Sequence, residues 1–447
     1  MKTKILTLML LSIQFIFAQE ITGSWQGELD VQGMKLPLII HIKKDGNKLV
    51  SSLESPKQGA TNIPISTISF IENQLLFDAA SLGLSYSGKY NNETIDGIFK
   101  QGGMEIPLIF KKLKDGETAN KIKRPQTPKA PFNYLTEEIS FVNPTDKNTL
   151  AGTISEPKNF DKKRPVLVMI TGSGRQNRDE ELFAHKPFAV IADDFAKKGI
   201  ATLRMDDRGV GGSSQGSKSE TTYNYATDIS AAVDFLIKKG YQNIGLIGHS
   251  EGGMIAPIVA SLNKKVAFMV LMAGPGTPID ELLAKQIYLS SKLTGMKEEN
   301  LEKELQSNQK TFAFIKNYAG NDYEKDLKNF LTKEGEEINE ENMKQLKNTW
   351  FRYFISFNPD KYVSQIKIPV LAINGSLDFQ VPAKDNLAAI EKSLKKAKNK
   401  NFETYEFEGM NHLFQECKTG ALAEYAEIEQ TISPKVLDKM STWILDK

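Results

Sequence analysis

From residue 136 onward, segments with the pattern of buried strands alternate with segments that have the pattern of helices. This alternation constrains the fold most, because consecutive parallel strands must be joined by crossovers, and helices in those crossovers cover both faces of one sheet. Eight stretches have strand character, at 138–142, 150–156, 166–171, 201–205, 243–247, 266–272, 368–374 and 402–407. Helical stretches lie between them at 187–198, 225–239, 252–262, 384–398 and 435–445. We therefore expect an α/β domain over residues 136–447, built on an eight-stranded, mostly parallel sheet.

The alternation is interrupted once, between the sixth and seventh expected strands. Residues 277–360 are rich in lysine and glutamate and have helical character throughout. A helical insertion at this point predicts a lid above one edge of the sheet.

The chain before this domain has a different pattern. At 447 residues it is longer than one hydrophobic core usually supports, so more than one domain is expected. Residues 20–112 consist of short alternating apolar runs separated by glycine, asparagine and proline, which predicts a small all-β module. Residues 113–135 are dense in lysine, proline and threonine, which is typical of an exposed linker.

The first nineteen residues have the order of a signal peptide. Lys2 and Lys4 precede an apolar run at 5–18, and a polar chain follows. The run is shorter than the roughly 20 residues that span a bilayer, so cleavage is favoured over anchoring. We expect residues 1–19 to be removed and the protein to be exported, periplasmic or extracellular, without a stable membrane anchor.

Charge and cysteine content exclude several classes of function. The 57 basic residues fall to 55 without Lys2 and Lys4, equal to the 55 acidic residues, so the balance gives no reason to expect a nucleic-acid partner. The single cysteine, Cys417, cannot form an internal disulfide, and the four histidines lack the paired spacing of a metal site. We expect no zinc-type metal cluster, and the sequence predicts no particular oligomeric state.

A glycine-flanked serine follows the fifth expected strand directly and precedes a helix. The pattern Gly-x-Ser-x-Gly at residues 248–252, in this strand-to-helix context, is that of a nucleophile elbow. Its sharp turn holds the serine in a strained backbone conformation and exposes the hydroxyl. Ser250 is the expected nucleophile; the alternative is a tight turn with an unused serine.

A serine hydroxyl needs a base to remove its proton, and the base needs a carboxylate to orient it. His412 follows the eighth expected strand and is the candidate base; Asp378 follows the seventh and is the candidate carboxylate. The alternatives are a solvated loop histidine and an aspartate that caps a helix. Asp280 is a second candidate acid, and His249 beside the nucleophile is a second candidate base.

Acyl transfer also requires N–H donors directed at the developing oxyanion. One candidate is the backbone N–H of Glu251, because it follows the nucleophile at the start of a helix. The second is expected from the glycine-rich loop after the third strand, where Ser173 and Gly174 are the candidates. This loop has neither the dinucleotide-binding nor the Walker spacing.

Several motifs together resemble a bacterial group of exported α/β-hydrolases known as esterases or serine peptidases. The residues that carry the resemblance are Thr171–Gly174, Asn177–Glu180, His185–Phe188, Asp206–Gly211 and Gly248–Gly253. It extends over about residues 136–447 and implies an eight-stranded sheet, a lid, a triad of Ser250, Asp378 and His412, and no cofactor. The substrate it implies is a small-molecule or peptide-like acyl compound.

The expected activity is hydrolysis of carboxylic esters through an acyl-enzyme intermediate. One alternative uses the same triad as a serine peptidase or aminopeptidase, with lid carboxylates at 334, 336, 337, 340 and 341 binding the ammonium group of the substrate. Further alternatives are a thioesterase or acyltransferase, and a binding protein with an inert hydrolase fold. The neighbours Asp207 and Arg208 are expected to form an ion pair that fixes their loop, or else to bind a substrate carboxylate.

Overall fold

The computed structural model describes residues 21–31, 34–46, 48–56, 60–102, 104–114, 123–216, 220–336 and 338–447. The expected signal peptide, residues 1–19, lies outside them. The chain divides into two compact units, one formed by most of the residues up to Ala119 and the other by Asn120–Lys447 together with two short earlier segments. Among the described residues, no helix is both long and apolar enough to cross a membrane.

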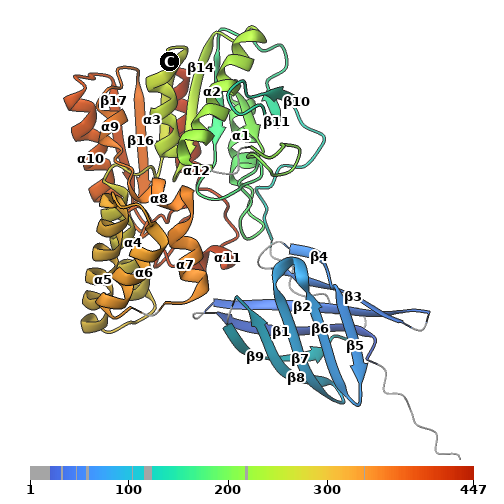
Figure 1. The fold of residues 1–447 in the computed structure, drawn as a ribbon. Coiled ribbons are helices and arrows are strands. Elements are labelled where there is room, and N and C mark those ends of the chain that lie inside the picture. The colour runs from blue at the N-terminus through green and yellow to red at the C-terminus, as the bar shows by residue number, and fades with distance from the viewer. Residues whose placement is uncertain are drawn as a thin grey trace, which may run out of the picture. The chain divides into compact units, whose positions relative to one another are not determined.

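The first unit is a nine-stranded sheet with the strand order β4-β3-β2-β1-β9-β8-β7-β6-β5 (Figure 1). From β5 to β9 each strand pairs with the next in antiparallel register, so short turns suffice as connections. A short 3-10 helix, η2 (Ala80–Leu82), joins β6 to β7. The strands are β1 (Gly23–Val31), β2 (Met34–Asp45), β3 (Lys48–Ser55), β4 (Ala60–Pro64), β5 (Thr67–Ile71), β6 (Gln74–Ala79), β7 (Leu84–Asn91), β8 (Thr94–Gln101) and β9 (Met104–Lys112).

Aromatic side chains fill the core of this unit. Tyr86 stacks on Phe77 at 5.2 Å between ring centroids and meets the edge of Phe110 at 5.1 Å. Its hydroxyl donates to the backbone carbonyls of Ile95 and Leu108, at 2.8 and 3.0 Å. The buried phenol therefore keeps its hydrogen bond while its ring supplies apolar area.

The second unit is built on an eight-stranded sheet with the order β10-β11-β13-β12-β14-β15-β16-β17. A strand lies at each of the eight stretches expected from the sequence. The sheet is mixed rather than uniformly parallel: β11 runs antiparallel to both β10 and β13, and the other pairs are parallel. The strands are β10 (Leu135–Val142), β11 (Thr149–Glu156), β12 (Pro165–Ile170), β13 (Ala201–Met205), β14 (Asn243–His249), β15 (Val266–Met272), β16 (Val370–Gly375) and β17 (Phe402–Phe407).

The antiparallel edge follows from the length of the connection between β10 and β11. Only six residues separate the end of β10 at Val142 from the start of β11 at Thr149, which is too short for a parallel crossover. Two strand-like stretches this close in the sequence form a hairpin.

Helices cover both faces of this sheet, and the central strands are apolar on both sides. In β12, Val166, Val168 and Ile170 belong to one apolar cluster, whereas Leu167 and Met169 belong to another. The first cluster includes side chains of α2, α3 and α10, and the second includes side chains of α1 and α12. The helices are α1 (Pro187–Lys197), α2 (Thr222–Lys238), α3 (Gly252–Leu262), α10 (Ala383–Lys396), α11 (Leu422–Glu427) and α12 (Pro434–Leu445).

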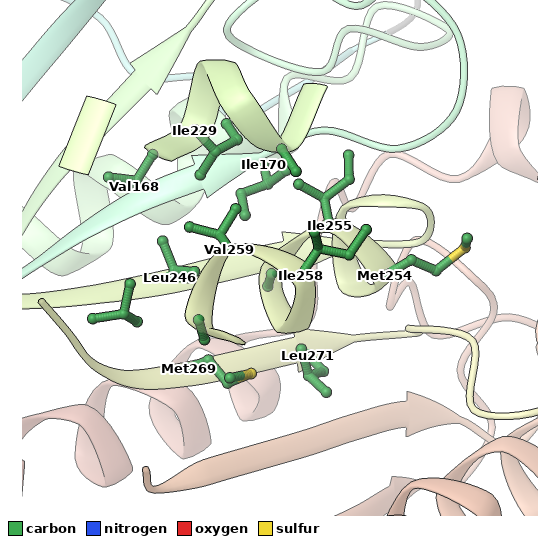
Figure 2. Packing of buried hydrophobic residues seen from close by; sticks show 14 of the residues in the cluster. Val168, Ile170, Ile229, Leu246, Met254, Ile255, Ile258, Val259, Met269 and Leu271 are labelled. Atoms are coloured by element: carbon green, nitrogen blue, oxygen red, sulfur yellow. The ribbon is translucent and has the colours of Figure 1, made fainter. Parts of the chain in front are cut away.

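Helix α3 begins directly after the candidate nucleophile and is buried along its length. Figure 2 shows Met254, Ile255, Ile258 and Val259 of α3 packed with side chains of β12, β14 and β15 and with Ile229 of α2. A buried helix of this kind needs apolar residues on every face. The packing fixes the helix end that carries the nucleophile turn.

The insertion expected as a lid lies between β15 and β16 and is helical. It has two small apolar clusters of its own, one around Phe312 and Phe351 and one around Leu331 and Met343. A last short helix precedes β16 and packs against α10. The helices are α4 (Ile279–Leu293), α5 (Glu298–Asn317), α6 (Tyr323–Glu334), α7 (Glu340–Lys347), α8 (Thr349–Ile355) and α9 (Asp360–Val363).

Part of the segment expected as an exposed linker is attached to the second unit. The Arg124 guanidinium donates to the backbone carbonyls of Phe183, Ala426 and Ile428, at 2.8 to 2.9 Å for the closest contact with each. The Gln126 side chain also bonds to the backbone near residue 432. This part of the segment therefore has a fixed path.

A buried guanidinium joins the β10–β11 turn to α2. Arg208 is fully buried and donates to Asp228 at 2.7 Å and to Asp146 at 2.6 Å. Asp228 in turn accepts hydrogen bonds from the side-chain amides of Asn143 and Asn148. Since the guanidinium and both carboxylates are paired, the charges can be buried together.

We predict that Arg208→Gln lowers the free energy of unfolding by about 3 to 5 kcal/mol, because it leaves two carboxylates without their buried counter-charge. The matched control is Arg175→Gln, which breaks an ion pair with Glu220 at an arginine that is 45% exposed. That change should cost less than about 1 kcal/mol. Urea denaturation of the three proteins measures the difference, and equal losses in the two variants would contradict the prediction.

Candidate active site

Ser250 occupies a strained turn between β14 and α3. Its φ is +54°, in the left-handed region that residues with a side chain rarely adopt. The two flanking glycines are required by close backbone contacts. A Cβ added at Gly248 would lie 2.1 Å from the carbonyl oxygen of Gly252, and one at Gly252 would lie 2.2 Å from that of Ile170.

His412 and Asp378 form a buried hydrogen-bonded pair. His412 Nδ1 lies 2.7 Å from Asp378 Oδ2, and both side chains are at most 5% exposed. The other carboxylate oxygen accepts the backbone N–H groups of Gln380 and Val381, at 2.8 and 2.9 Å. The carboxylate is therefore held in one orientation by the loop that carries it. The alternative acid, Asp280, pairs with Lys316 instead.

Ser250 and His412 line the same cavity, which has a volume of about 400 Å³. The lid contributes an apolar wall of leucine and aromatic side chains, and the loops after the strands contribute the opposite wall. The candidates Glu251 and Ser173 also lie at this cavity, whereas Gly174 does not line it. The lining lid residues are Leu282, Leu283, Gln286, Gln345, Trp350, Phe351 and Phe354.

The glycine-rich loop after β12 passes close to the nucleophile. A Cβ added at Gly172 would lie 3.2 Å from Ser250 Cβ, so a glycine lets the loop approach. The Gly172 N–H donates to Glu180 Oε1 at 2.6 Å and is not available to a substrate. Among the described residues, no acceptor contacts the backbone N–H of Ser173 or of Glu251. These two groups are free to bind an oxyanion.

Glu180 and His249 connect the loops that surround the site, and sequence reasoning assigned no role to Glu180. Its Oε1, which accepts from Gly172, also lies 3.0 Å from His249 Nδ1. His249 Nε2 lies 3.0 Å from the backbone carbonyl oxygen of His412. Loops after β12, β14 and β17 thus meet through two buried side chains. The only sequence signal was the presence of Glu180 in the 177–180 motif.

The charge state of His249 follows from these contacts. Both ring nitrogens face oxygen acceptors, which suits the imidazolium form, in which both nitrogens donate. Burial by itself lowers the pKa of His249, but the Glu180 carboxylate and the hydrogen bonds outweigh it and raise the pKa. His249 therefore has a partner of opposite charge and is not the partner of Asp378.

The Glu251 side chain links the nucleophile turn to the lid. Its Oε1 accepts the Thr222 hydroxyl at 2.7 Å and the Trp350 indole N–H at 2.9 Å. Burial raises the pKa of this carboxyl group. The residue whose backbone N–H is an oxyanion candidate is thus anchored on one side by α2 and on the other by α8.

Asp207 and Arg208 do not form the ion pair expected from the sequence. Asp207 accepts the Thr171 hydroxyl at 3.0 Å and the backbone N–H of Gln176 at 2.8 Å, while Arg208 pairs with Asp146 and Asp228. The prediction was wrong because the two neighbours have different surroundings. Neither lines the 400 Å³ cavity, which also argues against a carboxylate-binding role.

The lid carboxylates considered as ammonium ligands lie elsewhere. Glu334 pairs with Lys310, and Glu336 accepts a hydrogen bond from Ser307. Neither lines the cavity of Ser250. Residue 337 lies outside the described residues. Within the described parts of the chain, no group of three or more histidine, cysteine, aspartate or glutamate side chains could hold a metal ion.

The chain matches the family model of the alpha/beta hydrolase fold over residues 165–416, more than half of its length. It therefore belongs to that family. The matched region begins at β12 and includes Ser250, Asp378 and His412.

A curated relative and several solved structures are similar to the chain. Esterase EstD of Thermotoga maritima is 26% identical over 303 residues, which span 67% of this chain and 66% of the relative, slightly under two thirds of its length. Est1E of Butyrivibrio proteoclasticus is 18% identical, covering 69% of this chain and 98% of that one, with a TM-score of 0.42. Proline iminopeptidase of Mycobacterium smegmatis is 13% identical, covering 69% and 97%, with a TM-score of 0.43.

We predict that the free energy of unfolding falls as the pH rises, because of the raised pKa of Asp207. Burial, opposed by hydrogen bonds from Gln176 and Thr171, raises the pKa of Asp207 to about 8. Unfolded aspartate has a pKa of about 3.9, so between about pH 4 and pH 8 the folded state keeps a proton that the unfolded state has lost. Stability then decreases through this window and levels off above it.

Asp207→Asn removes this proton and should flatten the decrease. The measurement is the free energy of unfolding in urea at pH 5 and at pH 8, for both proteins. If the variant shows the same difference between the two pH values as the parent, the assignment is incorrect.

Proposed function

We propose that the protein is a serine hydrolase that cleaves carboxylic esters through an acyl-enzyme intermediate. The observation that carries the proposal is the buried pair of His412 and Asp378 beside a cavity shared with Ser250, whose backbone is strained. Membership of the α/β hydrolase family and the similarity to esterase EstD support it.

In the proposed acylation step, Ser250 Oγ attacks the ester carbonyl carbon while His412 Nε2 removes its proton. Asp378, bonded to Nδ1, keeps the imidazole in the tautomer that leaves Nε2 free and stabilises the imidazolium that forms. The backbone N–H groups of Glu251 and Ser173 donate to the oxyanion. One such donor is worth about 3 to 4 kcal/mol of transition-state stabilisation.

Collapse of the tetrahedral intermediate breaks the bond to the alcohol, which leaves with the proton from His412. Water then attacks the acyl-serine with His412 again acting as base, and the acid is released with Ser250 restored. No cofactor takes part in the reaction as proposed.

Glu180 and His249 act as positioning residues in this proposal. Through Gly172, Glu180 holds the loop that offers the Ser173 N–H, and through His249 it holds the backbone of the base, His412. A small displacement of either loop would misalign the reacting groups. This pair therefore sets the relative position of base and oxyanion donors.

The cavity favours an ester over an aminopeptidase substrate, because it offers no unoccupied carboxylate among its described residues to bind a substrate ammonium group. Of the described residues that line it, the acidic ones are Glu180 and Glu251, and both are already hydrogen-bonded to protein groups. A substrate ammonium would have to displace one of these bonds. The apolar lid wall suits an uncharged acyl group.

We also propose that the protein is exported. Support comes from the basic residues Lys2 and Lys4 followed by the apolar run at 5–18. N-terminal sequencing of the mature protein from a bacterial periplasm would test it, with removal of about nineteen residues as the supporting result.

We predict that Ser250→Ala lowers kcat for p-nitrophenyl esters by about 10⁶-fold, and Asp378→Asn by about 10⁴-fold. The first loses the nucleophile and the second favours the wrong imidazole tautomer. The matched control is Ser261→Ala on the same helix α3, whose hydroxyl donates to the Ile258 carbonyl. The control should retain full activity.

The same assays should include aminoacyl anilides and acyl thioesters, which distinguish the alternative activities. Turnover of anilides well above that of esters would replace the ester proposal with a peptidase. Full ester turnover by Ser250→Ala would remove Ser250 from the mechanism.

We predict that Glu180→Gln lowers kcat by about 10- to 100-fold, because it removes the charge that pairs with His249 and loosens both loops. The control is Glu181→Gln, which removes the same charge one residue away, where the carboxylate lies 3.4 Å from Lys186. Steady-state kinetics of both variants provide the comparison.

A second readout separates positioning from a general loss of stability. Because Glu180 raises the pKa of His249, the alkaline limb of kcat in Glu180→Gln should move to lower pH, where His249 now loses its proton. The groups that also face His249 are His412 and Asp378. An unchanged pH profile with a kcat equal to that of Glu181→Gln would rule out the positioning role.

A further inference from the structure

The lid contains a second cavity, of about 220 Å³, beside the cavity of Ser250. We call it the lid chamber. The described residues that line it all belong to the lid, from α4 to α8 and the α6–α7 connection. Its lining combines apolar side chains such as Phe312, Leu331 and Met343 with the polar groups of Ser307 and Glu336.

Members of both apolar clusters of the lid line the lid chamber. Phe312 and Phe351 belong to one cluster, and Leu331 and Met343 belong to the other. The lid chamber is partly open to solvent, and its volume is many times that of one water molecule. Its apolar lining gives a ligand chain a surface on which to leave water.

Two residues form the wall between the lid chamber and the cavity of Ser250. Phe351 and Gln345 line both. Phe351 is only 8% exposed and meets the edge of Phe312 at 6.4 Å between ring centroids. Its neighbour Trp350 bonds to Glu251 beside the nucleophile, so this part of α8 is attached to the reaction site.

We propose that the lid chamber is a second substrate subsite, which takes the distal end of an aliphatic ester chain, with Phe351 and Gln345 as the gate between the two cavities. The inference rests on the proposed function, because the chain must be attached to an ester carbonyl at Ser250. An aliphatic chain fits the apolar residues of the chamber, and Glu336, the acidic residue among the described residues that line it, already accepts a hydrogen bond from Ser307.

The chain can belong to the acid or to the alcohol of the ester, and two series of substrates distinguish them. One series varies the acyl chain from acetyl to dodecanoyl with p-nitrophenol as the leaving group. The other keeps an acetyl group and varies the alkyl alcohol. The quantity measured is the ratio of kcat/KM for the long and the short member of each series.

In the series whose varied chain enters the chamber, Met343→Trp should lower the long-to-short ratio of kcat/KM about 10-fold, because the larger side chain fills the chamber. Phe351→Ala should raise it about 5-fold, because it joins the two cavities. Met343→Phe, a smaller change, should have an intermediate effect and guards against misfolding of the first variant. Phe330→Trp lies on α6 and lines neither cavity, so it should leave the ratio unchanged.

A binding measurement keeps the two proposals distinguishable. Calorimetry with Ser250→Ala should detect decanoate or decanol but not acetate or ethanol, and adding Met343→Trp should weaken that binding about 10-fold. If the parent protein hydrolyses no ester but the binding results are as expected, the proposed function is wrong. The lid chamber is then still a binding site for an aliphatic chain. If the ratios in both series and the binding are unaffected by Met343→Trp, the lid chamber is not a subsite.

Discussion

The close approach of backbones around Ser250 is the constraint on which the rest of the site depends. Gly248 and Gly252 lie where any side chain would collide with the backbone of the turn or of β12, and between them Ser250 adopts a positive φ. Such strain persists only when the surroundings enforce it. Here they are α3, apolar on all sides, and the strands β12, β14 and β15 on which it packs. The apolar core thus holds Ser250 in this turn, where it lines the cavity.

Around this turn, charges and hydrogen bonds are satisfied in pairs that join different loops. Asp378 holds His412, Glu180 holds His249 and Gly172, and Glu251 holds Thr222 and Trp350. Each carboxylate is buried, so losing a partner would expose it to an apolar environment without compensation. The loops are therefore fixed relative to one another by the histidine partners of Asp378 and Glu180 and by the neutral donors that bond to Glu251, whose pKa burial raises. The bond from Trp350 extends this arrangement to the lid, where the proposed chain subsite begins.

Much of the fold could be predicted, because it depends on patterns among residues that are neighbours in the sequence. Strands such as β12 and β14 are short apolar runs, and helices such as α3 follow them after glycine-rich turns, so periodicity identifies both. The alternation predicted a mostly parallel sheet but did not indicate which strands run antiparallel; the short connection between β10 and β11 decides that for this pair. Glu180 was missed because its partner His249 lies 69 residues away, and no spacing rule connects a carboxylate with an imidazole over that distance.

The sequence by itself determined the alternating strands and helices, the nucleophile turn at Ser250, and the placement of Asp378 and His412 after successive strands, because each of these depends on neighbouring residues or on chain order. Only the tertiary structure decided which charged groups pair. Asp207 and Arg208 are adjacent in the chain yet have separate partners, and the side chains of Glu180 and Glu251 have partners that no sequence pattern indicated. The physical reason is that burial and hydrogen-bond geometry depend on which segments pack together, and the energetics of a charged group follow from those surroundings.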